Sequence, residues 1–159
     1  MSEWAHLARR FVTSLSRRPP SPDDERWAHE QLLSGERAVW DAMSPVDRRH
    51  ALIVARRMEA ALGAEATRPA IAAALLHDCG KTDAGFGTFG RVGVTLWGKV
   101  RGDAAKRGDG RVARYLDHER RGALQLEKAG SERLTVALVA VSPDAPVALR
   151  DALARADDV

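Results

Sequence analysis

Apolar residues recur every three or four positions along most of the chain, which is the spacing of one buried helix face. In residues 2–16, the apolar positions that share such a face are Trp4, Leu7, Ala8, Phe11 and Leu15. The helix formers Ala, Leu, Arg and Glu dominate the sequence, and runs of β-branched residues are short. The pattern therefore predicts an all-α fold.

Local signals indicate where the helices begin and end. Ser21-Pro22 and Ser44-Pro45 each place a capping hydroxyl before a proline, with acids in the next turn, so we expect a helix to begin at each. The second of these helices should end at Gly63, in a left-handed cap. Further helices are expected at 67–79, 111–116, 117–129 (closed by a glycine), 131–141 and 147–157.

Nine of the 13 glycines lie between residues 80 and 110, which we interpret as a loop with a short helix over 91–99. Two patterns in this stretch resemble nucleotide-binding motifs, but the residues around them do not fit either motif. The G-x-G-x-x-G pattern at 85–90 lacks the preceding strand of a dinucleotide-binding fold. The Gly-Lys-Thr sequence at 80–82 lacks the earlier glycine of a P-loop, because position 75 is leucine.

Composition narrows the classes of partner. The 159 residues amount to one domain with a net charge of +3, and its 21 Arg and 4 Lys are scattered among 22 acids. Aromatic residues make up only 5%, so nucleic acid is not an expected partner. No apolar run is long enough to cross a membrane, and no signal peptide is recognisable. The single cysteine, Cys79, excludes an intramolecular disulfide and a multi-cysteine zinc site, and we expect a cytoplasmic protein.

Five polar residues stand on apolar helices or at their ends: His50, the doublet His77-Asp78, His118 and Asp157. Buried carboxylates are costly unless they are paired or bound to a metal. Two imidazoles and two carboxylates meeting from three helices would suit Mn, Fe, Co, Ni or Zn better than Ca. Spacing alone leaves the alternative open that these are packed or capping side chains in a helical interaction domain.

The order of these residues resembles the HD-domain superfamily of metal-dependent phosphohydrolases. Its hallmark is a histidine, then a His-Asp doublet, often within H-D-x-G-K, then a late aspartate; here these are His50, His77-Asp78-Cys-Gly-Lys81 and Asp157. The runs at 87–91 and 115–123 also resemble a small bacterial branch of that superfamily. The resemblance covers 44–158 and implies an HD-domain helical bundle over 44–159, with residues 1–43 as a helical extension packed on it.

The resemblance also implies roles for individual residues. The metal ligands would be His50, His77, Asp78 and Asp157, around one divalent ion: Mn, Fe, Co, Ni, Zn or Mg. Asp78 would also orient or deprotonate the attacking water, so that the catalytic set is Asp78, Lys81 and His118. The substrate would be a small phosphate ester such as a nucleotide. Lys81 follows the doublet by one helical turn and is a candidate for contacting its phosphate, as are Arg91 and His118. The alternatives are that Arg91 is an ordinary solvated arginine of the Gly-rich loop and that His118 is a packing histidine.

One departure from the family pattern concerns a second metal ion. His118 matches the first of the additional histidines that members with two metals supply, but the stretch 137–143 contains no histidine. We therefore expect one firmly bound metal per chain. The alternative is an HD-like module with little or no activity that binds a nucleotide or a partner protein.

Overall fold

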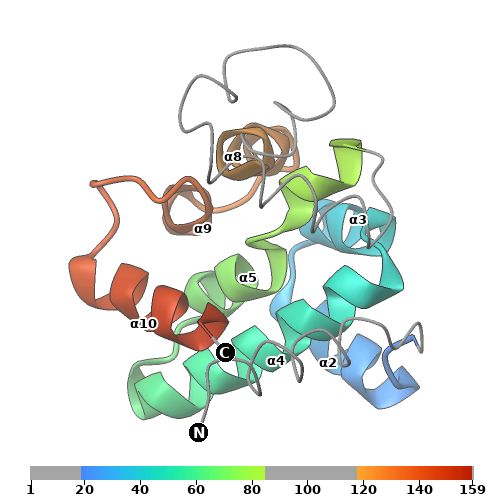
Figure 1. The fold of residues 1–159 in the computed structure, drawn as a ribbon, viewed down its shortest axis with the longest axis horizontal. Coiled ribbons are helices and arrows are strands. Elements are labelled where there is room, and N and C mark those ends of the chain that lie inside the picture. Colours follow the sequence, from blue (N-terminus) through green and yellow to red (C-terminus); the bar gives the residue numbers. More distant parts are fainter. Residues whose placement is uncertain (1–18, 85–117, 159) are drawn as a thin grey trace, which may run out of the picture.

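A computed structural model describes residues 19–84 and 118–158, and in these ranges it contains α-helices and two short 3-10 helices but no strand (Figure 1). The all-α prediction is thereby confirmed. The helices are α2 (Pro22–Gln31), α3 (Ser34–Ala42), α4 (Pro45–Leu62), α5 (Arg68–Leu76), α8 (His118–Lys128), α9 (Arg133–Val139) and α10 (Val147–Asp157), with η1 (Gly63–Glu65) and η2 (Cys79–Ala84). The helices expected in 2–16, 91–99 and 111–116 lie outside the described residues.

Helix α5 forms the centre of the core. Residues 70–76 are all buried, each at most 2% exposed, so the helix is apolar on every side. Helices α4 and α9 pack along α5, and α2 and α3 also contact it, as Figure 1 shows. Four of these seven residues are alanines, which lets the neighbouring helices approach closely.

The expected helix starts are confirmed at atomic detail. The hydroxyl oxygens of Ser21 and Ser44 each accept a hydrogen bond from the backbone N–H three residues later, at 3.2 Å. The end of α4 differs from the prediction. Gly63 has a positive φ of 54°, which favours glycine, but its ψ of −122° lies outside the left-handed helical region.

The sequence pattern did not indicate the break between α2 and α3. The backbone is extended at Leu32 and Leu33, and the N–H of Leu33 donates to the carboxylate of Glu36 at 2.7 Å. Glu36 is fully buried, and its charge is balanced by the Arg68 guanidinium at 3.2 Å. Because Arg68 also pairs with Glu132, this contact joins the break to the start of α5 and to the loop before α9.

A close backbone contact joins η2 to α8. A Cβ atom on Gly80 would lie 2.0 Å from the carbonyl oxygen of His118 and 2.7 Å from the backbone nitrogen of Gly122. Only a residue without a side chain allows this approach. The glycine of the H-D-x-G-K sequence therefore fixes where α8 begins relative to the His77-Asp78 doublet.

We expect Gly80→Ala to lower the free energy of unfolding by about 3 kcal/mol, because two backbone segments would have to separate. Gly130→Ala is the matched control. It meets no heavy atom within 4 Å, and its φ of 76° gives a cost of about 1 kcal/mol. Denaturant unfolding of both variants measures the difference, and equal losses would show that the contact at Gly80 is unimportant for stability.

Candidate metal centre

Three helices bring the predicted ligands together. His50 lies on α4, the His77-Asp78 doublet follows the last turn of α5, and Asp157 is the last residue of α10. Helix α4 packs against both α5 and α10, so the three elements meet at one place (Figure 1). His50, His77 and Asp78 form a group that could hold a metal ion, since one donor atom from each lies within 4.8 Å of the others.

Asp157 joins this group through the two histidines. Its Oδ1 atom lies 2.7 Å from Nε2 of His50, in a hydrogen bond that spans 107 positions of the chain. The same oxygen lies 3.4 Å from Nε2 of His77. All four residues expected to bind metal are therefore neighbours, although Asp157 is half-exposed and Asp78 is buried.

The orientation of His77 is set by the end of its own helix. Its Nδ1 atom lies 2.9 Å from the carbonyl oxygen of Ala74, and because a carbonyl only accepts, Nδ1 must carry the proton. In the neutral ring, Nε2 is then left with its lone pair. That atom is buried and has no hydrogen-bond partner among the described residues; the contact with Asp157 Oδ1 is an ion-pair distance only.

An unpartnered nitrogen lone pair inside a protein is unfavourable unless something binds it. A divalent ion would satisfy it, and backbone hydrogen bonding of the opposite ring nitrogen is the usual way in which a metal-binding imidazole is held. The ring of His50 lies beside that of His77, with centroids 5.4 Å apart and planes tilted by 58°. Two imidazoles and two carboxylates make a donor set that fits a transition-metal ion.

Asp78 stands among three groups that carry or can acquire positive charge. Its Oδ2 atom accepts a hydrogen bond from Nζ of Lys81 at 2.6 Å, and its Oδ1 atom lies 3.7 Å from His77 Nε2 and 3.6 Å from His118 Nε2. Burial opposes ionisation, but His77, Lys81 and His118 outweigh it and lower the pKa of Asp78 to about 2. The carboxylate is therefore ionised at neutral pH.

The charge of the centre favours a cation. The hydrogen bond from His50, followed by the neighbouring His77 ring, holds the pKa of Asp157 far below its ordinary value. Burial disfavours the charged form of His77, but Asp78 and Asp157 outweigh this effect, so the His77 pKa is raised. The two carboxylates therefore attract positive charge. Lys81 and a proton on His77 supply it in the absence of metal, and a divalent ion at the histidine nitrogens would take the place of that proton.

The other predicted site residues divide into two groups. Lys81, on η2, and His118, the first residue of α8, both reach Asp78, as described above. Arg91 lies outside the described residues. The stretch 137–143, which contains no histidine, contributes Leu138 and Val139 to the core.

A second His-Asp pair shows what distinguishes the centre. His29 Nε2 and Asp41 Oδ1 lie 2.9 Å apart between α2 and α3, with side chains 39% and 54% exposed. Neither residue belongs to the group of potential ligands. His50 and Asp157 are exposed to a similar extent, so what distinguishes the centre is that further donors, from His77 and Asp78, meet them there.

One neighbour of the centre was missed by the sequence analysis. Nη1 of Arg57 lies 3.5 Å from the carbonyl oxygen of Ala156, the residue before Asp157. Arg57 follows His50 by seven positions, two turns further along α4. The spacing of seven residues was the only sign in the sequence that Arg57 could lie near the centre. An ordinary exposed arginine on a helix can have the same spacing.

Comparison with known proteins gives no match: no family model, no curated protein and no solved structure is similar to this chain.

Titration calorimetry with Mn²⁺, Ni²⁺ or Zn²⁺ is expected to give one tight site per chain. His77→Ala should weaken metal binding about 100-fold or more, because it removes the nitrogen that has no other partner. His29→Ala removes a histidine from an equally close His-Asp pair and should leave the affinity unchanged. Two equally tight sites, or unchanged binding by His77→Ala, would contradict this assignment.

Proposed function

We propose that this protein is a metal-dependent phosphohydrolase of the HD-domain type, acting on a phosphate ester. The observation that supports the proposal most is the buried, unpartnered Nε2 of His77, which faces a group of donors completed by His50, Asp78 and Asp157. The residue order His, H-D-x-G-K, Asp supports the reaction class through its resemblance to the superfamily. One divalent ion, drawn from Mn, Fe, Co, Ni, Zn or Mg, would be held by these four side chains.

A bound divalent ion lowers the pKa of coordinated water and polarises a phosphoryl oxygen. Asp78 has two oxygens with different surroundings, because Lys81 holds Oδ2 while Oδ1 faces the histidines. Oδ1 is therefore the oxygen available to a ligand or to the attacking water. Its low pKa keeps it unprotonated, so it serves as a hydrogen-bond acceptor that orients the water.

Lys81 supplies positive charge beside the reacting phosphate. Its side chain is only 20% exposed, which strengthens its electrostatic effect relative to a solvated lysine. One of its N–H donors reaches Asp78 at 2.6 Å, so its positive charge lies directly beside the carboxylate that would face the substrate. A protonated lysine cannot be a metal ligand, so its role is to offset the charge of the substrate.

His118 reaches the other side of the Asp78 carboxylate, from α8. Its side chain is 22% exposed, and its Nε2 atom is 3.6 Å from Asp78 Oδ1. An imidazole titrates near neutral pH, so it is suited to deliver a proton to the leaving oxygen as the phosphorus–oxygen bond breaks. We assign it that role and a share in binding the phosphate.

The second candidate is an HD-like module that binds a nucleotide or a protein with little or no turnover. It is favoured by the lack of a histidine in 137–143, where the resemblance to the superfamily leads us to expect a ligand for a second metal. Metal binding together with nucleotide binding, but without release of phosphate, would support this candidate over the hydrolase.

Release of phosphate from para-nitrophenyl phosphate and from a panel of nucleotides, with each metal added in turn, tests the hydrolase. Asp78→Ala should abolish both metal retention and activity. Lys81→Ala should retain the metal and reduce turnover about 100-fold, the usual cost of one charge-stabilising group.

Lys128→Ala is the matched control, because Lys128 is an exposed lysine at the end of α8 and should leave turnover unchanged. Loss of metal in Lys81→Ala together with its retention in Asp78→Ala would reverse the two roles and refute the assignment.

A further inference from the structure

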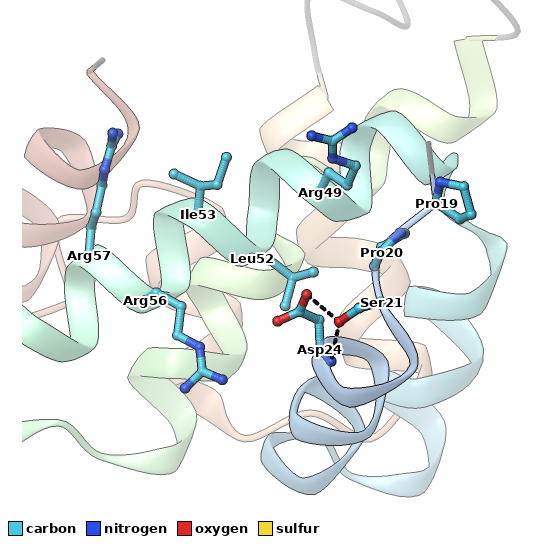
Figure 2. A pocket seen from close by; sticks show the side chains of 9 residues that line it. All are labelled: Pro19, Pro20, Ser21, Asp24, Arg49, Leu52, Ile53, Arg56 and Arg57. Carbon is cyan, nitrogen blue, oxygen red and sulfur yellow. Dashed lines mark hydrogen bonds between the residues drawn. The ribbon is translucent and has the colours of Figure 1, made fainter. Parts of the chain in front are cut away.

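A cavity of about 520 Å³ lies along α4 beside the start of α2 and the residues that precede it (Figure 2). Three arginines, Arg49, Arg56 and Arg57, contribute to its wall, against a single acid, Asp24. Between them lie apolar side chains, among which Ile53 is 45% exposed. The cavity is thus basic at its edges and apolar between them.

Asp24 and Arg56 are held by close partners. The Asp24 carboxylate accepts a hydrogen bond from the Ser21 hydroxyl at 2.7 Å, and the Asp24 N–H donates to the same hydroxyl at the cap of α2. The Arg56 guanidinium lies 3.4 Å from the centroid of the Trp27 ring and 3.3 Å from the Glu59 carboxylate. Neither group is positioned to recognise a ligand.

Arg57 differs from Arg56 in its surroundings. It makes no ion pair with any residue of the described ranges, and its one hydrogen bond goes to the carbonyl of Ala156. That contact uses a single N–H of the five in a guanidinium, and it turns the group toward the end of α10. Within residues 19–84 and 118–158 the other donors have no hydrogen-bond partner, and a guanidinium can bind phosphate oxygens two at a time.

The position of Arg57 relates the cavity to the metal centre. It follows His50 by two helical turns, about 10 Å along the axis of α4. It also contacts the residue that precedes Asp157, which itself is bonded to His50. Figure 2 shows Arg49, Ile53 and Arg57 on the same side of α4, one turn apart from one another.

We propose that Arg57 binds a second anionic group of the substrate, so that the substrate is a phosphate ester carrying a further phosphate, such as a nucleoside bisphosphate. The reacting phosphate would lie at the metal centre, and the second would lie at the Arg57 guanidinium, beside the end of α10. Ile53 offers apolar surface for the organic part that joins them, and Arg49 adds positive charge beyond it. This inference rests on the proposed phosphate-binding function of the centre, but it does not require turnover.

Calorimetry of the metal-loaded protein with adenosine 5′-monophosphate and adenosine 3′,5′-bisphosphate tests the inference. The wild type should bind the bisphosphate about tenfold more tightly, the usual gain from a partly exposed hydrogen bond between charged groups. Arg57→Gln should remove this preference and leave monophosphate binding unchanged, and Arg57→Lys should retain part of it, because the charge remains without the planar fork.

Arg26→Gln is the matched control, since Arg26 is an exposed arginine outside the cavity wall and should preserve the preference. Circular dichroism confirms that each variant is folded. Equal weakening of both ligands by Arg57→Gln would show that Arg57 only supports the end of α10, and a wild type without preference would also overturn the inference. Turnover is measured separately: a bisphosphate preference without phosphate release would refute the hydrolase and support the second anion site.

Discussion

The centre depends on one constraint: a helix that is apolar on every side has to end inside the protein. Helix α5 is such a helix, and it ends with an imidazole and a carboxylate that its own burial keeps away from water. The last carbonyls of a helix also need donors. The Nδ1–H of His77 donates to one of them, the carbonyl of Ala74. The same hydrogen bond orients the ring so that Nε2 faces His50 and Asp157.

The helices were predictable where their boundaries are decided by adjacent residues. The starts of α2 and α4 follow from Ser-Pro pairs, and the bounds of α10 agree with the expected 147–157. The break at Leu32 and Leu33 was not predictable, because it depends on a buried Glu36 that is paired with a residue 32 positions away. The described residues form seven helices that the periodicity largely located, but periodicity carries no information on such distant ion pairs.

The candidate ligands were predictable as a set only through the order in which they occur. Nothing in the local sequence distinguishes His50 from His29, since each lies on a helix and each meets an aspartate in the fold. What separates them is the convergence of α4, α5 and α10, which is a property of the packing. Arg57 was missed for the same reason, because its relation to the centre exists only after α10 has packed on α4.

The contact between His50 and Asp157 has a consequence for the integrity of the whole chain. It joins residues 107 positions apart, and an ion that binds only the folded arrangement would add its binding free energy to the stability of this closure. The single cysteine rules out a disulfide for this purpose. An ion held jointly by α4, α5 and α10 would therefore act as the cross-link that the chain otherwise lacks. Binding of the metal ion would then be coupled to the docking of α10 on the rest of the protein.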